Sequence, residues 1–397
     1  MFDITIEQSV LAKALDYLEP TVGKGNSNLG ENCISMATTG NGSIEMYTTN
    51  SVEFTKLEAI VSFGGNTQEQ APYVDFKRFA AIIKSIPSNE VISIKASVND
   101  LLINFALKKT PIKLVGDSNG MIPLPSNNFV VNAQSMTIPY ALLYNALNNV
   151  CCIITDSVST PIYNCMRIYT DQTNVEITAL DMNGKRTFVQ SGLATGLNPT
   201  SDILIEASKL KKSFKIFENY TEIEMVMDNN IICIKGDVPV SAHTQTANGM
   251  VSEIVYYARR LNGSYPTNIK STFAPLPVEF SEINKEELLN SISRVKALED
   301  SSTGGNITFE VNGNTAIIST SSAYGNLEDS ITTENTISSS FKTTFKYTSL
   351  SDIMKVIDTN SFEIGVLPNH PTNYVIKAKG NTDIMFTIPG IVSNVTP

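Results

Sequence analysis

Segments in which apolar and polar residues alternate recur along the chain, and each group of them follows an amphipathic segment. The first amphipathic segment lies in "FDITIEQSVLAKALDYL", where Val10, Leu11, Ala14, Leu15 and Leu18 share one helical face. The alternating segments "CISMATT" and "GSIEMYTT" come next and predict strands. A second helix in "YVDFKRFAAIIKSI" and two more strands, "VISIKAS" and "LLINFAL", follow. The pattern predicts two half-repeats, each of one helix and several antiparallel strands.

The same order of elements occurs twice more, beginning at "MTIPYALLYNALNNV" and at "PVEFSEINKEELLNSISRVKAL". The starts lie about 130 to 140 residues apart, which is the length of one ordinary domain. A half-repeat of about 65 residues is too small to bury its own core, so each pair should share one, with helices on one side of the sheets. We predict an α+β fold of three repeated domains at residues 1–128, 133–262 and 276–397, with linkers near 126–134 and 271–277.

The composition is typical of a globular protein in a reducing compartment. Of 397 residues, 42% are hydrophobic and 17% are charged. The start "MFDITIEQSV" lacks a signal-peptide pattern and no apolar run is long enough to cross a bilayer, so we expect a cytoplasmic protein. The five cysteines form no CxxC pair, and His243 and His370 lie apart from any cysteine cluster, so we expect neither a metal nor a cofactor.

Positive charge is concentrated in the predicted helices. The formal net charge of the chain is −10 and its pI is about 4.9, which at first argues against binding to nucleic acid. The predicted helices (7–18, 75–85, 139–150, 206–217, 284–298 and 349–358) together carry about +4, so the remainder carries about −14. Helices gathered on one side of an assembly would then attract phosphates. The alternative is that lysine is simply a good helix former.

The stretch "ITALDMNGKRTFVQ", residues 177–190, contains a Gly-Lys pair and raises the question of a phosphate-binding loop. A Walker loop needs GxxxxGK[ST] between a strand and a helix, but here Ala179 takes the first glycine's place and Arg186 follows the lysine. Both flanks are strand-like, and Asn183-Gly184 is a typical hairpin dipeptide. We therefore predict a hairpin turn and no nucleotide site.

The three repeats with basic helices resemble the bacterial beta sliding clamp, the beta subunit of DNA polymerase III and its processivity factor. The local similarities are "IYNCMRIYTDQTNVEITALDMNGKRTF", "LNGSYPTNIK" and the ending "FTIPGIV", which occur in the family's order over nearly the whole chain. The resemblance implies a DNA-binding ring protein in DNA replication that tethers a polymerase and is not an enzyme. Its partners would be duplex DNA, held without sequence preference, and the polymerase and clamp loader, bound through short peptide motifs.

Domain size indicates how many copies such a ring needs. A domain of about 130 residues is roughly 35 Å across, so three in a ring leave a hole of only about 5 Å. Six leave a hole of roughly 35 Å, wider than the duplex of about 20 Å. One chain cannot encircle DNA, whereas a head-to-tail homodimer can.

The resemblance also implies site residues. For contact with DNA it implies Lys24, Lys77 and Arg78, to which the helix charges add Lys209, Lys211 and Lys212. For a peptide-binding pocket it implies Ile162, Tyr163, Leu180, Gly184, Lys185, Arg186, Thr187, Pro266, Lys270, Phe386, Ile388, Pro389, Gly390 and Ile391. For the dimer interface it implies the edge strand with Ile112 and Leu114, and the helix end at Ala297 and Leu298.

The chain departs from the family pattern around this pocket. Met182 and Asn183 resemble an insertion, Lys185 replaces a usual histidine, and Gly390-Ile391-Val392 with five further residues replaces a terminal Met-Arg-Leu. These departures indicate a divergent clamp whose preferred peptide differs. The rival interpretation is a structural or assembly protein, such as a virion or scaffold component, because acidic antiparallel sheets rich in Ser, Thr and Asn suit that role too. Catalysis has no motif in its support.

Overall fold

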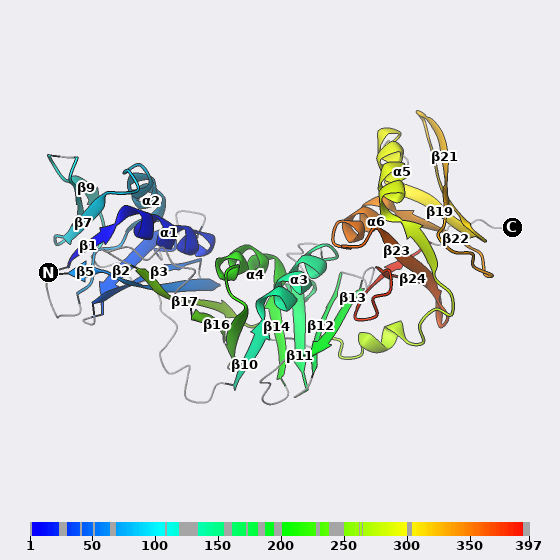
Figure 1. The fold of residues 1–397 in the computed structure, drawn as a ribbon, viewed down its shortest axis with the longest axis horizontal. Coiled ribbons are helices and arrows are strands. Elements are labelled where there is room, and N and C mark those ends of the chain that lie inside the picture. Colours follow the sequence, from blue (N-terminus) through cyan, green and yellow to red (C-terminus); the bar gives the residue numbers. More distant parts are fainter. Residues whose placement is uncertain are drawn as a thin grey trace. The chain divides into compact units, whose positions relative to one another are not determined.

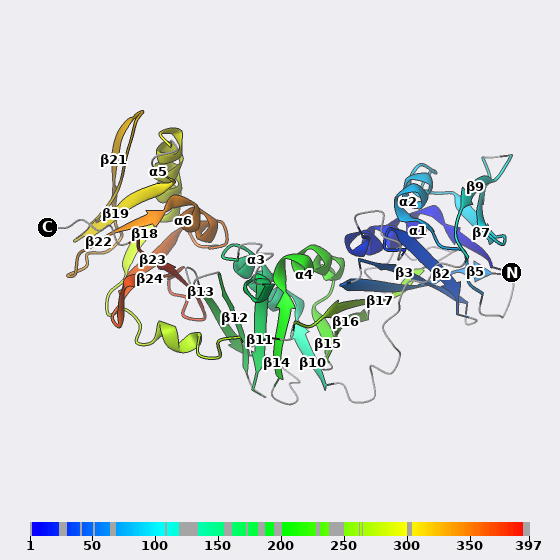
Figure 2. The ribbon, with the colours of Figure 1, turned by 180° about the vertical axis from the view of Figure 1, so that it is seen from behind.

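The structure of the chain is a computed structural model, drawn in Figure 1 and, from behind, in Figure 2. It describes residues 2–23, 30–39, 42–50, 52–63, 69–107, 109–118, 134–154, 161–171, 174–181, 187–193, 201–227, 231–237, 250–261, 263, 265–299 and 304–391. Its α-helices are α1 (Gln8–Leu18), α2 (Phe76–Lys84), α3 (Tyr140–Cys151), α4 (Ala207–Phe214), α5 (Lys285–Ala297) and α6 (Tyr347–Met354). Short 3-10 helices are η1 (Glu19–Thr21), η3 (Pro161–Asn164), η5 (Lys215–Phe217) and η7 (Lys270–Phe273).

The chain forms two compact units. Unit 1 consists of residues 1–143, 195–198 and 212–260. Unit 2 consists of residues 144–194, 199–211 and 261–397. Each unit therefore combines one terminal repeat with half of the middle repeat.

Unit 1 contains two antiparallel sheets. The larger has eight strands in the order β10-β15-β16-β17-β4-β3-β2-β6. These strands are β10 (Gln134–Pro139), β15 (Glu222–Met227), β16 (Ile231–Asp237), β17 (Met250–Arg259), β4 (Glu53–Ile60), β3 (Ser43–Thr49), β2 (Cys33–Thr38) and β6 (Val74–Asp75). The smaller sheet has the order β5-β1-β7-β8-β9, from β5 (Ser62–Phe63), β1 (Asp3–Glu7), β7 (Val91–Ala96), β8 (Asp100–Phe105) and β9 (Ile112–Val115).

Unit 2 contains an eight-stranded and a four-stranded sheet, both antiparallel. The eight-stranded order is β14-β11-β12-β13-β25-β24-β23-β18. The strands are β14 (Ser201–Glu206), β11 (Cys165–Thr170), β12 (Asn174–Leu180), β13 (Thr187–Leu193), β25 (Ile384–Pro389), β24 (His370–Ala378), β23 (Ser361–Leu367) and β18 (Ser281–Asn284). The four-stranded order is β21-β20-β19-β22, from β21 (Gly325–Thr332), β20 (Thr315–Ser322), β19 (Asn306–Asn312) and β22 (Phe341–Lys346).

The two eight-stranded sheets have the same construction. In each, three strands from the first half of one repeat and the strand before its second helix join three strands from the second half of the next repeat and that repeat's first strand. The junction is β17 against β4 in unit 1 and β25 against β13 in unit 2. The remaining strands form half-sheets of the same kind, which end at the edge strands β9 and β21.

The helices form where apolar spacing and capping residues favour them. On α1, the predicted face of Val10, Leu11, Ala14, Leu15 and Leu18 is buried. The Asp75 side chain accepts a hydrogen bond from the backbone N–H of Arg78 and so caps α2. Asn284 caps α5 in the same way through the N–H of Glu287.

The predicted α+β class is confirmed, and each predicted helix is present. The largest shift in bounds is at the last one, which begins at Tyr347 and ends at Met354, whereas we predicted 349–358. Hydrophobic spacing shows reliably that a helix is present, but it locates the ends of the helix less well, because the final turn depends on local capping. No helix in the described residues has the length and apolar character needed to span a membrane.

Candidate functional site

An apolar cluster lies on one face of the eight-stranded sheet of unit 2, and we call it the linker cluster. It is formed by strand residues together with the segment 261–280 that links the second and third repeats. Its buried members are Cys165, Leu180, Leu204, Tyr265, Ile269, Phe273, Leu367, Val375 and Met385. Ile162, Tyr163, Leu261 and Phe280 pack against it and remain partly exposed. The partly exposed members give the cluster an accessible apolar surface.

Strand register explains which side chains face the cluster. Leu180 pairs with Thr187, Thr187 with Thr387, and Thr387 with Val375, which places these positions in one row across four strands. Met385 lies two residues before Thr387 and therefore faces the same side.

The structure places Phe386 and Ile388 on the opposite face of β25, where both are 1% exposed. They alternate with Met385 and Thr387, so they do not join the linker cluster. Their assignment to a peptide-binding pocket stays a prediction, since a family resemblance does not fix which side of a strand a residue faces.

Buried polar groups lie beside the linker cluster. Arg167 donates two hydrogen bonds to Asp202, at 2.8 and 2.9 Å, and this pairing raises the pKa of Arg167. Its guanidinium carbon also lies 5.1 Å from the centroid of the Tyr169 ring. The hydroxyl of Thr178, which pairs with Arg167 across the strands, is fully buried and has no hydrogen-bond partner among the described residues. Burial raises the pKa of the Cys165 thiol to about 12, so this cysteine is an apolar core residue and not a nucleophile.

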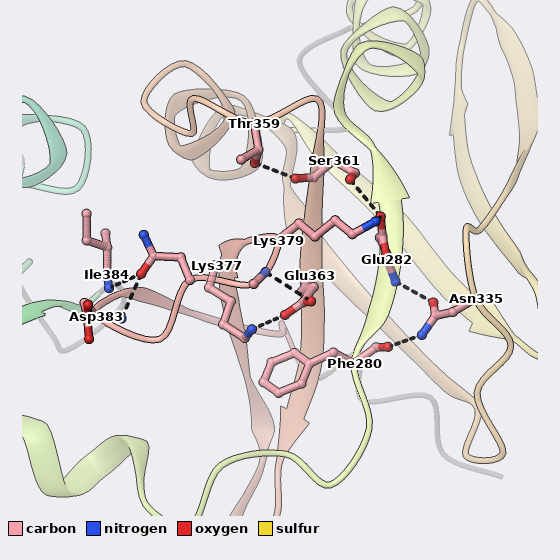
Figure 3. Close-up of polar contacts among 12 residues, drawn as sticks. Phe280, Glu282, Asn335, Thr359, Ser361, Glu363, Lys377, Lys379, Asp383 and Ile384 are labelled. Atoms are coloured by element: carbon pink, nitrogen blue, oxygen red, sulfur yellow. Dashed lines mark hydrogen bonds and ion pairs between the residues drawn. The ribbon is translucent and has the colours of Figure 1, made fainter.

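A second ion pair lies beside Phe280 near β18, and Figure 3 shows it. Lys377, only 6% exposed, pairs with Glu363 on the neighbouring strand, and its Nζ lies 4.7 Å from the centroid of the Phe280 ring. Asn335 donates to the Phe280 carbonyl at 2.7 Å and accepts from the Glu282 N–H at 2.7 Å. These contacts fix the end of the linker segment against the sheet.

The structure describes only some of the other predicted pocket residues. Pro266 and Lys270 are exposed on the linker segment, and Lys270 Nζ lies 3.7 Å from the Glu176 carboxylate. Thr187 begins β13, and Gly184, Lys185 and Arg186 lie outside the described residues. Strands β12 and β13 are antiparallel neighbours on the two sides of this turn, which agrees with the predicted hairpin and excludes the strand–loop–helix context of a Walker loop.

The end of the described chain shows why a glycine stands at position 390. A Cβ atom there would lie 2.1 Å from Thr343 Oγ1 and 3.0 Å from the Tyr374 ring, so a larger residue does not fit without rearrangement. The Gly390 N–H donates to the Thr372 carbonyl at 2.6 Å, and the Ile391 N–H donates to the Thr344 carbonyl at 2.7 Å. Pro389, Gly390 and Ile391 therefore connect the eight-stranded sheet to β22.

The predicted DNA-contacting residues lie on helices. Lys77 and Arg78 are exposed on α2, and neither side chain forms an ion pair with a described residue. On α4, Lys209 pairs with Glu206 at 2.8 Å, Lys211 lines a cavity, and Lys212 is exposed. Lys24 lies outside the described residues.

The predicted interface residues lie at sheet edges and a helix end. Ile112 and Leu114 belong to β9, the edge strand of the five-stranded sheet. Ala297 ends α5 and Leu298 caps it.

Sequence reasoning missed several residues of the linker cluster, chiefly Tyr265, Ile269 and Phe273, and also the Arg167–Asp202 pair. The spacing of four between the three apolar linker residues was a usable signal. No group of three or more His, Cys, Asp or Glu side chains among the described residues is arranged to hold a metal ion. What the site offers is an apolar surface with charged groups at its border, which suits binding rather than bond-making chemistry.

No family model matches the chain, and no curated protein matches its sequence. Solved structures match over its whole length. The DNA polymerase III subunit beta from Pseudomonas aeruginosa matches with a TM-score of 0.83 at 12% identity, covering 99% of this chain and 100% of that one. The DNA polymerase sliding clamp from Bacillus subtilis gives 0.82 at 16%, covering 98% and 99%. The beta subunit from Thermotoga maritima gives 0.80 at 12%, covering 98% and 99%. The chain therefore has the fold of the sliding-clamp structures, as the sequence analysis predicted.

Proposed function

We propose that this chain is a DNA sliding clamp. In this proposal it encircles duplex DNA as a homodimeric ring in the cytoplasm, tethers the replicative polymerase and other proteins for processive synthesis, and has no catalytic activity. The observation that carries the proposal is the match to clamp structures along at least 98% of both chains at TM-scores of 0.80 to 0.83. The three domains at 1–128, 133–262 and 276–397 would be the units of the ring.

Sheet construction supports a head-to-tail dimer. Two of the three junctions between half-sheets are made within the chain, at β17 with β4 and at β25 with β13. By position in the repeats, β9 corresponds to β17 and β25, while β21 corresponds to β4 and β13. The third junction would therefore be β9 of one copy against β21 of another, which would satisfy the backbone groups of both edges and close the ring.

Positive charge on helices supports contact with DNA. Lys77 and Arg78 on α2, and Lys211 and Lys212 on α4, are available to phosphates in a chain of net charge −10. Weak contacts of this kind are independent of sequence and exchange with counterions, so they would allow sliding. Lys24 and Lys209 belong to the same proposal.

The linker cluster supports a peptide-binding role. Ile162 and Tyr163 are partly exposed above a buried apolar floor, and the Lys270–Glu176 pair lies on its border. A short peptide from a polymerase or clamp loader would place apolar anchors there. Thr343 and Tyr374 fill the space that a side chain at position 390 would occupy. The preferred peptide should therefore differ from that of clamps with a larger residue at this position.

Retention on circular DNA tests the function. The protein is loaded with its clamp loader onto a nicked circular plasmid, the mixture is separated by gel filtration, and the plasmid is then cut once. We expect the protein to stay on the circle and to leave the linear DNA. Equal retention on both forms contradicts encirclement. Native mass measurement separates the alternative, because an assembly protein should form species larger than a dimer of the 43.2 kDa chain.

A further inference from the structure

A polar cavity of about 710 Å³ lies within unit 2, on the side of the sheet opposite the linker cluster. Its walls come from the C-terminal part of α3, from Lys211 of α4, from the segment after α6, and from the turn between β24 and β25. A volume between about 300 and 1,000 Å³ is typical of small-molecule sites. Of its lining residues, Lys211 enters the proposed clamp function, as a contact to phosphate, and the cavity itself has no part in it.

Asparagine amides are the main polar groups of the cavity. Asn145, Asn148 and Asn149 follow the three- and four-residue spacing that places them on one face of α3. Asn149 is only 6% exposed, and its side-chain amide forms no hydrogen bond with any residue that the structure describes. The amides line the cavity, so a ligand with complementary donors and acceptors would form hydrogen bonds with them.

A fourth amide is oriented by the turn between β24 and β25. The Asn381 side-chain oxygen accepts hydrogen bonds from the N–H groups of Asp383, at 2.8 Å, and Ile384, at 3.1 Å. Figure 3 labels Asp383 and Ile384 at this turn. The bonds hold the oxygen, so the Asn381 NH₂ is the part of this amide that can donate to a ligand.

The charged groups of the cavity balance one another. Lys211 and Lys355 are matched by Asp352 and Asp358, and Lys355 Nζ lies 3.0 Å from Asp352. This balance does not favour an ion of either sign. The remaining wall is apolar, with Ile357 at 4% exposure beside Ile384 and Phe386.

We propose that this cavity binds a nucleobase. A nucleobase is a neutral planar ring with apolar faces and adjacent hydrogen-bond donors and acceptors along its edge. Its faces match the apolar wall, and an asparagine amide pairs with such edges through one donor and one acceptor. The base can belong to a free nucleoside or to an unpaired nucleotide of single-stranded DNA. Only the second source rests on the proposed clamp function.

Binding is measured by saturation-transfer NMR with four free nucleosides, adenosine, guanosine, cytidine and thymidine, and with ribose as the probe that lacks a base. We expect at least one nucleoside to bind and ribose not to bind. Asn148→Ala with Asn149→Leu should weaken binding about tenfold or more, since two amide contacts are lost. Asn290→Ala is the matched control on α5, where an exposed asparagine lies outside the cavity, and it should leave binding unchanged.

A second readout uses the thiols of Cys151 and Cys152, which line the cavity. In the unaltered protein, the nucleoside should slow alkylation of these two thiols and leave the half-buried Cys33 of β2 unaffected. If the double variant does not fold, Asn145→Ala with Asn148→Ala replaces only positions that retain solvent exposure and tests the same face.

A separate measurement tests whether the bound base belongs to single-stranded DNA. It compares the binding of a single-stranded thymidine oligonucleotide with that of an abasic strand carrying the same number of phosphates. Tighter binding of the first, lost in the asparagine variant, supports an unpaired base as the ligand. Nucleoside binding without this difference supports the free nucleoside. The proposal is overturned if no nucleoside binds up to about 10 mM, or if binding neither slows alkylation of Cys151 and Cys152 nor responds to the asparagine variants. These outcomes are independent of the test with circular DNA.

Discussion

The two eight-stranded sheets have the same construction, yet one pair of equivalent faces differs in chemistry. In unit 2 this is the face that carries the linker cluster. In unit 1, Glu253 pairs with Glu58 and Glu58 with Glu45, so three carboxylates lie side by side on β17, β4 and β3. The corresponding strands of unit 2 carry Thr387, Thr187 and Leu180 in one row. The same sheet construction thus tolerates a row of carboxylates or an uncharged row at this position.

Apolar surface on these faces differs as well. Among the described residues of unit 1 there are two small clusters, one of Val226, Cys233 and Val255 and the other of Tyr47 and Phe54. Unit 2 has the larger linker cluster, with Tyr265, Ile269 and Phe273 supplied by the segment between repeats. Because the sheet forms without such a cluster in unit 1, its presence in unit 2 has a role other than forming the sheet. The cluster holds the linker segment against the sheet, and peptide binding is the further role that we propose for it.

The largest expected effect concerns the half-sheets that have no partner within the chain. Ile112→Asp with Val115→Asp places two carboxylates on β9, where Val115 is 71% exposed. If β9 pairs with β21 of a second copy, burying these charges should raise the dimer dissociation constant by about 100-fold or more. Native mass spectrometry at several protein concentrations measures it. Val98→Asp, at a residue that is 80% exposed in the β7–β8 turn, is the control that should remain dimeric. A dimer of unchanged strength in the β9 variant contradicts the proposed interface.

The next effect tests the difference between the two faces directly. Ile162→Ala with Tyr163→Ala removes the partly exposed side chains of the linker cluster. Binding of a peptide that carries the clamp-binding motif of the cognate replicative polymerase should weaken about tenfold or more, since two apolar anchors lose their contact. Fluorescence anisotropy of the labelled peptide measures the change.

The matched control for peptide binding lies on the equivalent face of unit 1. Tyr73→Ala with Tyr257→Ala removes two tyrosines that pack, partly buried, against the smaller aromatic cluster. Peptide affinity should stay within twofold of the unaltered protein. Equal losses in both variants would mean that peptide binding does not distinguish the two faces.

A smaller effect concerns acid stability of the segment that enters β18. The Glu279 carboxylate accepts hydrogen bonds from the N–H and hydroxyl groups of Ser338 and Ser339, which lower its pKa to about 2. Since the unfolded value is about 4.3, the stabilisation is complete above that pH and is lost as the pH falls toward 2. Glu279→Gln should therefore reduce stability at neutral pH, and the difference from the unaltered protein should vanish near pH 2.

Urea unfolding at several pH values measures the Glu279 contribution. Ser338→Ala with Ser339→Ala should act in the same direction, because it removes the two hydroxyl donors and keeps the charge. A stability difference that does not change between pH 5 and pH 2 would rule out this carboxylate as the cause.

The smallest effect concerns the carboxylate row of unit 1. Glu253→Gln removes one of the like charges that lie directly opposite each other and should stabilise the protein by about 0.5 kcal/mol at low salt. Thermal unfolding at low and high ionic strength measures this gain, which should shrink as salt is added. A loss of stability would show that the row is not under repulsion. Peptide affinity should be unaltered, because the row lies in the other unit.

Much of the fold could be predicted from the sequence because it depends on local periodicity. The spacing of Val10, Leu11 and Ala14 identifies α1, and alternation in "CISMAT" identifies β2. Asn183-Gly184 likewise predicts the turn between two antiparallel strands. These features depend on residues a few positions apart, so the sequence alone determined the helices, the main strands and the threefold repeat.

Only the tertiary structure decided which segments from different repeats share a sheet and which side of each strand they face. Glu53 accepts a hydrogen bond from Ser213 at 3.2 Å across 160 positions of the sequence, and no local pattern indicates that contact. The choice of Met385 over Phe386 for the linker cluster, and the gathering of four asparagines around one cavity, have the same origin. A one-residue shift in register reverses every side chain of a strand, and register is fixed by long-range packing.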